Sequence, residues 1–338
     1  MLLDDRDGPG GAWRDAWESL RLFSPAAYSS LPGWRMPLWA GDGNPPAGHV
    51  RAYLAEYERR YDLPVERPAR VREVACTRSL DEDPRPADDR LLVRTDANIY
   101  AARVVINATG TWSQPHWPAY PGMRDYGGIQ LHTADYRSAD DFAGRRVLVV
   151  GGGNSGAQIA ADLLDTAAQV TWSTTRPPRY LPDHIDGRAL FEAATQRVRG
   201  LQIGAEHTGV AALGDIVAVP PVRHARDNRG QHAMPMFERL TPKGVRWDDG
   251  TEQPVDAIIW CTGFRPALRH LHALRLDRHG GHPLTDPDRP TRSLSDPRLH
   301  FVGYGDWCGP ASATLIGVSQ PARSAVDDAL EYLGKATR

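Results

Sequence analysis

Little in this 338-residue sequence indicates a disulfide, a thiolate metal site or a membrane span. Its three cysteines, Cys76, Cys261 and Cys308, lie far apart and form no CxxC pair, so a local redox dithiol is not expected. No apolar run approaches the roughly 18 residues that a membrane span needs. The first seven residues turn acidic too early for a signal peptide. We therefore expect a soluble, cytoplasmic protein without a metal centre.

An excess of charge of one sign is also missing. The chain has 40 Lys and Arg against 42 Asp and Glu, and the two signs are interspersed. No basic face therefore indicates a nucleic acid or an anionic membrane as partner, which leaves small molecules. Glycine and proline, by contrast, are plentiful at 32 and 28 residues. They predict many turns and short connections, which is typical of an enzyme.

The clearest predicted element is an apolar strand at 145–150 that runs directly into a glycine-rich turn. A helix at 157–164 and a strand at 169–173 complete a strand-turn-helix-strand unit. The remaining predicted elements are a helix at 49–61, a three-stranded meander of 71–77, 91–95 and 102–107, buried strands at 255–260 and 299–303, and a helix within 321–333.

The glycine-rich turn has the GxGxxG spacing of a dinucleotide site at Gly151, Gly153 and Gly156. The first glycine permits the tight turn, the second lets a pyrophosphate approach the backbone, and the third lets the helix pack close to the strand. Amide groups at the helix N-terminus, at Asn154 and Ser155, would hold the phosphates. A turn that only allows close packing is the alternative, but the position between strand and helix favours a cofactor.

The residues about 20 positions further on indicate which nicotinamide cofactor binds. An NAD site usually has an acidic residue there, which accepts a hydrogen bond from the ribose 2′-hydroxyl. This sequence has Ser173, Thr174 and Arg176 instead. Hydroxyls and a guanidinium suit a 2′-phosphate, so NADP(H) is favoured over NAD(H). An exposed loop charge is the alternative for Arg176.

The turn and several other segments together resemble the flavin-containing monooxygenase family. The family signature is similar to Gly153-Asn154-Ser155-Gly156 and to Tyr126-x-Gly128-x-x-x-His132-x-x-x-Tyr136, with Tyr in place of the usual first Phe. The two Ala-Thr-Gly turns that cross between the family's domains are similar to Ala108-Thr109-Gly110 and Cys261-Thr262-Gly263. Segments that contact FAD resemble Gly10-Gly11-Ala12-Trp13 and Gly303-Tyr304-Gly305-Asp306.

The resemblance implies an α/β fold with two Rossmann-like dinucleotide-binding domains. An NADP domain at 113–262 would be inserted into a discontinuous, N-terminally truncated FAD domain at 1–112 and 263–338. NADPH would reduce FAD, and the reduced flavin would transfer oxygen from O2 to a small nucleophilic or soft substrate. Because the flavin performs the difficult chemistry, we assign no catalytic acid or base. For His132 we favour a role in linking the domains over proton transfer.

The resemblance also shows a missing unit. Members of the family begin with a strand, a GxGxxG turn and a helix that hold the ADP part of FAD. Roughly 30 residues of such a unit are absent from this sequence. Leu2-Leu3-Asp4 resembles the end of the next strand, so Asp4 would meet the adenosine ribose. Either the true start lies upstream, or the chain has lost or weakened FAD binding.

Two other functions stay open from the sequence. A non-enzymatic or FAD-deficient NADP-binding protein would follow if the start is genuine. A pyridine nucleotide-disulfide reductase shares the architecture, but the isolated cysteines argue against it. The histidines between 270 and 282 and the arginines of 223–229 are expected to lie in solvated loops.

Overall fold

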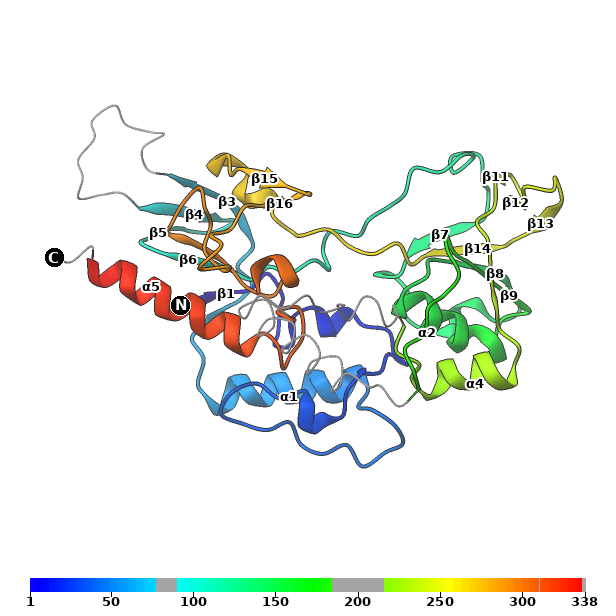
Figure 1. Ribbon diagram of the computed structural model, residues 1–338, viewed down its shortest axis with the longest axis horizontal. Coiled ribbons are helices and arrows are strands. Elements are labelled where there is room, and N and C mark those ends of the chain that lie inside the picture. The colour runs from blue at the N-terminus through cyan, green and yellow to red at the C-terminus, as the bar shows by residue number, and fades with distance from the viewer. Residues whose placement is uncertain (77–89, 184–215, 310, 336–338) are drawn as a thin grey trace.

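The computed structural model describes residues 1–76, 90–183, 216–309 and 311–335. Figure 1 shows two lobes side by side along the long axis, joined by extended segments, with both chain termini at the same lobe. We call the lobe that contains the termini the terminal lobe and the other the central lobe. Among the described residues, no helix combines the length and the apolar character that crossing a bilayer requires.

A five-stranded parallel sheet forms the core of the central lobe, in the order β10-β9-β8-β14-β7. Its strands are β7 (Ile129–His132), β8 (Arg146–Val150), β9 (Gln169–Ser173), β10 (Ala233–Met234) and β14 (Ala257–Trp260). Parallel strands are usually covered on both faces, which explains why β8 and β14 are apolar at nearly every position. This sheet lies entirely within the predicted insert 113–262.

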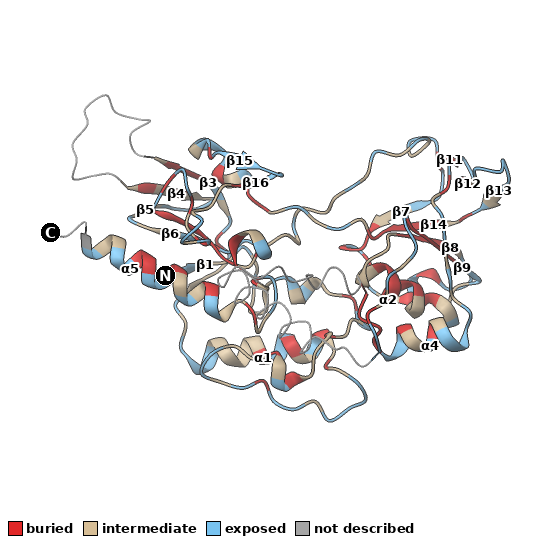
Figure 2. Cartoon of the chain, viewed as in Figure 1, coloured by how far each residue is buried: buried red, intermediate tan, exposed pale blue. Residues whose placement is uncertain are grey.

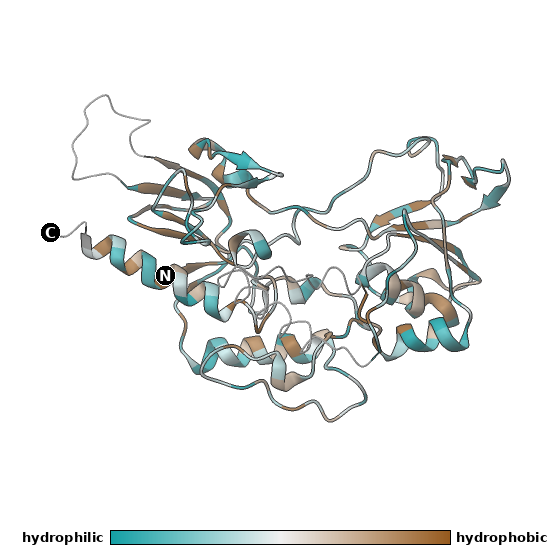
Figure 3. Cartoon of the chain, viewed as in Figure 1, coloured by the Kyte–Doolittle hydropathy of each residue, from teal (hydrophilic) through white to brown (hydrophobic). Residues whose placement is uncertain are grey.

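Alternate residues of β8 serve two different cores. Val147 and Val149 pack with α2 (Asn154–Asp162) and α4 (Pro220–Asn228), whereas Leu148 and Val150 pack on the other face. That face is covered by an antiparallel sheet of β11 (Arg239–Thr241), β12 (Gly244–Arg246) and β13 (Glu252–Pro254). Figure 2 shows burial concentrated in the parallel strands, and Figure 3 shows hydrophilic residues along much of α4. The central lobe therefore has three layers.

The terminal lobe contains several small sheets. An antiparallel meander has the order β3-β4-β5, and two parallel pairs are β1 with β2 and β6 with β17. Its elements are β1 (Leu2–Leu3), α1 (Ala47–Arg60), β2 (Val65–Glu66), β3 (Val71–Cys76), β4 (Leu91–Thr95), β5 (Ile99–Ala102), β6 (Val105–Asn107), β15 (Arg278–His279), β16 (His282–Pro283), β17 (Leu299–Phe301) and α5 (Ser319–Lys335). The short 3-10 helices of this lobe are η1 (Gly11–Asp15), η2 (Ala26–Tyr28), η7 (Arg269–Leu274) and η8 (Asp306–Cys308), whereas η4 (Ala139–Phe142) and η5 (Leu163–Asp165) pack in the central lobe.

Most predicted elements are confirmed, with three corrections. The third strand of the meander is β5, because β6 leaves the meander and pairs in parallel with β17. The segment 223–229, expected as a loop, is mostly α4, which begins at Pro220; proline is well tolerated in the first turn of a helix. The segment 270–282, also expected as a loop, contains η7 and the β15–β16 hairpin.

A buried histidine in the terminal lobe predicts acid sensitivity. His300 on β17 is fully buried, 3.7 Å from the Asp328 carboxylate of α5, and near Arg289 and Arg292. Burial first, and these two cations second, lower the pKa of His300 from 6.5 to about 4. Below pH 6.5 the unfolded chain therefore binds more protons than the folded chain, so the free energy of unfolding falls as the pH drops.

We expect this effect of His300 to lower the free energy of unfolding by about 2 kcal/mol between pH 7 and pH 5. Chemical denaturation across this pH range measures the effect. The free energy of unfolding of the His300→Asn variant should fall by about 2 kcal/mol less than that of the wild type. The exposed His279 provides the control, because His279→Asn should keep the wild-type slope. An unchanged slope in His300→Asn would contradict the assignment.

Candidate functional site

The glycine-rich turn lies at the carboxyl edge of the parallel sheet, where β8 ends and α2 begins. Gly151 has a φ of 135°, and a Cβ there would lie 2.2 Å from the Cys261 carbonyl oxygen. A Cβ on Gly156 would lie 2.1 Å from the Gly151 oxygen, whereas a Cβ on Gly153 would meet nothing within 4 Å. Two glycines are therefore required by the protein's own packing, and Gly153 borders open space.

Two contacts that the sequence did not suggest hold this turn in place. The Trp172 indole Nε1 on β9 donates to the Gly151 carbonyl at 2.8 Å, and the Asn154 side-chain oxygen accepts from the Val217 backbone N–H at 2.8 Å. Trp172 is 2% exposed. The only sequence signal for it was an aromatic residue in a short strand about 20 residues after the turn. These bonds fix the backbone that a pyrophosphate would approach.

The residues after β9 differ in their availability to a cofactor. Ser173 is fully buried and its hydroxyl donates to the Pro235 carbonyl at 2.7 Å. That hydroxyl holds the end of β9 and does not point to solvent, so we remove Ser173 from the candidates for a 2′-phosphate contact. Thr174 is 3% exposed and lies next to Gly152, whereas Arg176 is exposed. Arg176 is the residue of this group that suits the phosphate.

The two segments that connect the lobes run beside each other. The His116 N–H donates to the Gly263 carbonyl at 2.9 Å, and the Arg265 N–H donates to the Gln114 carbonyl at 2.9 Å. The Thr262 hydroxyl also donates to the His116 carbonyl. Because Cys261 lies against Gly151, this double connection begins directly beside the glycine-rich turn. The structure therefore brings the Thr262-Gly263 turn and the GxGxxG turn together.

His132 connects the end of β7 to this double connection. Its Nδ1 accepts from the Ala134 N–H at 3.1 Å, so the ring is neutral and its Nε2–H donates to the Gly263 carbonyl at 3.0 Å. Burial lowers the pKa of His132, which keeps the ring neutral. Phe264 lies edge-on to the imidazole and stacks on Trp112 at 4.9 Å between ring centroids. This geometry suits a linking residue better than a proton donor.

Replacing the imidazole should loosen the connection without removing the cofactor site. We expect His132→Ala to slow flavin reduction by NADPH about tenfold, because small misplacements of reacting groups are costly, while the Kd for NADP⁺ stays near the wild-type value. Stopped-flow absorbance and calorimetry measure the two quantities. Tyr136→Phe, which removes a bond to Asp162 in the same segment, should leave the reduction rate unchanged. Equal losses in both variants would refute a linking role.

On the side of the terminal lobe, Tyr304 joins the first crossing turn to the C-terminal segment. The Thr109 hydroxyl donates to the Ala267 carbonyl at 2.7 Å, so the Tyr304 hydroxyl donates to Thr109 Oγ1. The Tyr304 oxygen accepts from the Asn107 side chain and the Thr109 N–H. The His270 Nε2–H donates to Asn107 at 2.8 Å. Tyr304 and His270 were not among the predicted site residues, although Tyr304 lies inside the quoted Gly-Tyr-Gly-Asp pattern.

Several glycines around this network have an open side. Gly110, Gly263, Gly303 and Gly305 have φ between 65° and 97°, and a Cβ on any of them would meet nothing within 4 Å. Such positions let a ligand approach the backbone closely. Asp306, at the start of η8, is exposed, and its carboxylate accepts from the Ala311 N–H at 3.2 Å. These residues are compatible with an extended cofactor that passes the crossing turns.

The other predicted FAD contacts lie elsewhere in the terminal lobe. Asp4 follows β1, as expected for the end of a parallel strand, and its carboxylate accepts from the Arg6 N–H and from Arg67 Nε at 2.7 Å. Gly10 and Gly11 have positive φ and begin η1, while Trp13 packs against the cluster that includes Val50 of α1. Asp4 is therefore held by Arg67 at the end of β1, and Gly10, Gly11 and Trp13 belong to a turn that contacts α1.

Comparison with known proteins agrees with this architecture. Residues 34–188 match the family model described as pyridine nucleotide-disulphide oxidoreductase. A flavin-containing monooxygenase from Stenotrophomonas maltophilia has 45% identity and a TM-score of 0.84, covering 98% of this chain and 91% of that chain. Indole-3-pyruvate monooxygenase YUCCA6 of Arabidopsis thaliana is 30% identical, covering 78% of this chain and 70% of that protein. The chain belongs to the flavin-containing monooxygenase family.

Other relatives agree with this assignment. An uncharacterized CzcO-like oxidoreductase of Geobacillus kaustophilus is 27% identical over 96% of this chain and 89% of its own length. Cyclohexanone monooxygenase, at 17% identity and a TM-score of 0.67, shares the fold. This flavin-containing monooxygenase is thus an FAD- and NADP-dependent oxidoreductase that acts on a small molecule with O2. The non-enzymatic alternative is not favoured.

Proposed function

We propose that the 113–262 unit binds NADPH at the Gly151–Gly156 turn and that FAD lies along the crossing turns of the terminal lobe. The two units would exchange hydride where the lobes are joined. The observation that carries the proposal is the pair of connecting segments hydrogen-bonded beside the glycine-rich turn. This arrangement links the nucleotide turn and the open glycines of the terminal lobe through one short piece of backbone.

Each cofactor has a set of candidate residues in this proposal. The nucleotide phosphates would approach Gly153 and the amides of Asn154 and Ser155, where the α2 N-terminus favours negative charge, and Arg176 would hold the 2′-phosphate. FAD would lie near Thr109-Gly110, Thr262-Gly263 and Gly305-Asp306, with Asp4, Gly10, Gly11 and Trp13 as more remote contacts. Trp172, Tyr304 and His132 would position these backbone segments.

The chain's own residues would prepare the site for the cofactors' chemistry. When bound, NADPH supplies hydride to FAD and the reduced flavin supplies activated oxygen to the substrate. The Trp112–Phe264 stack and the edge contact of His132 would exclude water from the connection between the lobes. The substrate class we favour is a small nucleophilic or soft molecule. The cytoplasm remains our expected location, in agreement with three described cysteines that form no disulfide.

Burial of the cysteines argues against a disulfide reductase. Burial raises the pKa of the Cys261 thiol to about 12, and it also raises the pKa of Cys308. Neither thiol would ionise readily near neutral pH, and only a thiolate attacks a disulfide. Two of the three described cysteine thiols are thus poorly reactive, so the reactive pair that disulfide reduction needs is missing among the described residues.

The deciding experiment is the visible absorbance spectrum of the purified chain before and after FAD is added. We expect a protein-bound flavin spectrum that bleaches when NADPH is added without oxygen. Calorimetry with NADP⁺ on the same sample measures the nucleotide site separately. A folded chain that binds NADP⁺ but takes up no FAD would contradict the proposed flavin reaction for this chain.

A further inference from the structure

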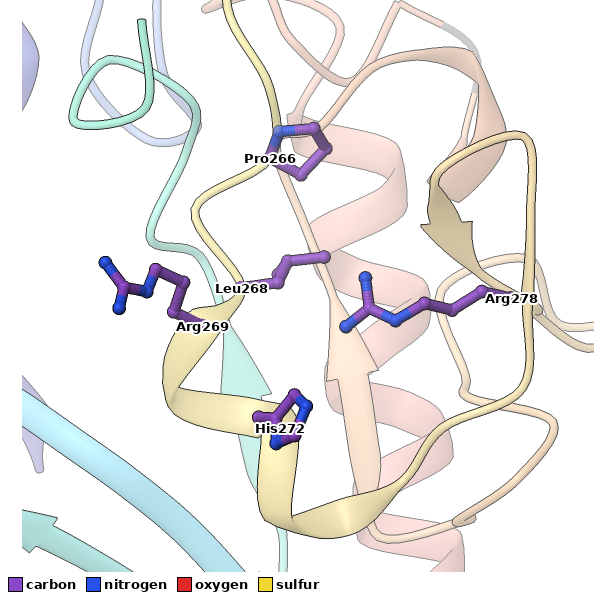
Figure 4. Close-up of a pocket in the computed structure, with 5 residues that line it drawn as sticks. All are labelled: Pro266, Leu268, Arg269, His272 and Arg278. Carbon is purple, nitrogen blue, oxygen red and sulfur yellow. The ribbon is translucent and has the colours of Figure 1, made fainter.

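A cavity lies in the terminal lobe, apart from the nucleotide turn. It has a volume of about 430 Å3 and is lined by Pro266, Leu268, Arg269, His272 and Arg278. Figure 4 shows the Arg278 side chain directed toward Leu268, with Pro266 above and His272 of η7 below them. The volume is within the range of small-molecule sites.

The lining combines positive charge with an apolar floor. The apolar part of the lining consists of the half-buried Pro266 and of the edge of Leu268, a core residue that is 4% exposed. Arg269 and Arg278 remain charged at any physiological pH, and no carboxylate lines the cavity. Figure 4 places Arg269 and Arg278 on opposite sides of Leu268, with the Arg278 guanidinium directed toward Leu268 and that of Arg269 directed away from Arg278. An occupant that carries negative charge beside an apolar body fits the Arg278 side of this lining.

Three acidic residues of the chain segment 277–296 are engaged by other partners. Asp277, the sequence neighbour of Arg278, accepts from the Ser295 hydroxyl at 3.1 Å. Asp286 and Asp296 pair with Arg292 and Arg298 respectively. Within the described ranges no ion pair is formed by Arg269 or Arg278, so the positive charge at the cavity is not neutralised by the fold.

We propose that this cavity binds a small organic carboxylate with an apolar body, such as an arylalkanoic acid. Planar guanidinium groups match a carboxylate by bidentate hydrogen bonds, and Leu268 with Pro266 would cover the apolar body. A bare inorganic anion would leave that hydrocarbon surface unused. The site is distinct from the proposed nucleotide contacts and does not depend on flavin chemistry for its test.

The cavity is joined to the crossing turns by the backbone between its lining residues. Ala267 lies between Pro266 and Leu268; its N–H donates to the Gly110 carbonyl at 2.9 Å and its carbonyl accepts from the Thr109 hydroxyl at 2.7 Å. A bound acid that contacts Pro266 and Leu268 would therefore hold the second connection in one position. The site suits an acidic substrate before oxygen is transferred to it, or an acidic effector of the same reaction.

Calorimetric titration with phenylacetate tests the site directly. We expect saturable binding at millimolar concentrations or below, and a loss of about tenfold in affinity in the Arg269→Gln, Arg278→Gln double variant. Arg275→Gln removes an exposed charge from the same segment outside the cavity and should bind like the wild type. Phenylacetamide, which has the same body without the charge, should bind at least tenfold more weakly.

Each contrary result would overturn the proposal. Binding of inorganic phosphate as tight as that of phenylacetate would show a plain anion site. Equal affinity of the double variant and the wild type would place the acid elsewhere, and no binding of either phenylacetate or octanoate to the folded wild-type chain would remove the site. Thermal unfolding of each variant checks that the exposed substitutions leave the fold intact. NADP⁺ binding, which belongs to the other lobe, should be unchanged in all of them.

Discussion

Gly153→Ala should lower the affinity for NADP⁺ about 100-fold while leaving the fold unchanged. The backbone of Gly153 has ordinary extended geometry, with φ at −102°, and a Cβ there would meet no protein atom within 4 Å. A methyl group would therefore occupy only the space proposed for the pyrophosphate. Displaced phosphate would lose charge-assisted bonds to amides, each contributing about 1.5–3 kcal/mol. Calorimetry with NADP⁺ measures the loss, and the Tm should move by less than about 2 °C.

Two further glycine variants separate binding from stability. Gly48→Ala lies in α1, where the new Cβ also has open space, and it should change neither NADP⁺ affinity nor fold. Gly151→Ala places a Cβ 2.2 Å from the Cys261 oxygen at a φ of 135° and should destabilise the chain by about 3 kcal/mol or more. Wild-type NADP⁺ affinity in Gly153→Ala would refute the phosphate site at this turn.

Arg176→Glu should raise the KM for NADPH about 100-fold and change the KM for NADH by less than about threefold. The guanidinium would make charge-assisted bonds to the 2′-phosphate that contribute about 1.5–3 kcal/mol, and the new carboxylate would add repulsion. NADH lacks that phosphate, so it loses little. Steady-state rates of NADPH and NADH oxidation on the flavin-loaded enzyme provide both constants.

Arg145→Glu is the matched control for this charge reversal. Arg145 is exposed and immediately precedes β8, so it lies at the amino edge of the sheet, opposite the nucleotide turn. In the Arg145→Glu variant the KM for NADPH should stay within about twofold of the wild-type value, because exposed charges that lie about 10 Å or more apart are largely screened from each other. Parallel increases for both nucleotides in Arg176→Glu would point to general damage and against selective phosphate binding.

Local chemistry explains why much of the central lobe could be predicted. The apolar run of β8, the glycine spacing after it and the helix that follows form one continuous unit, so the unit depends on residues close in sequence. The error in the meander has a non-local cause. Val105–Asn107 has the same strand character as its neighbours, and only the distant β17, almost 200 residues away, offers the edge with which it pairs.

The packing of residues 17–23 also depends on tertiary structure. Trp17, together with Leu20 and Phe23, packs against the core of the central lobe, where Trp17 meets Tyr136 edge-on. The proposed domain boundary at residue 112 divides the chain by sequence position. Side chains before this boundary nevertheless pack in the core of the central lobe. No local pattern carries this information, because burial is decided by which surfaces meet.

The sequence by itself determined the parallel α/β unit, the glycine turn and the family, because backbone conformation and short spacings are properties of neighbouring residues. Only the tertiary structure decided which predicted polar groups face a ligand. In the folded chain the Ser173 hydroxyl points into the protein, and Trp172 and Tyr304 hold backbone segments in position. The two connecting segments run side by side. A hydroxyl or indole has the same identity in every environment, and its hydrogen-bond partner depends on the fold that surrounds it.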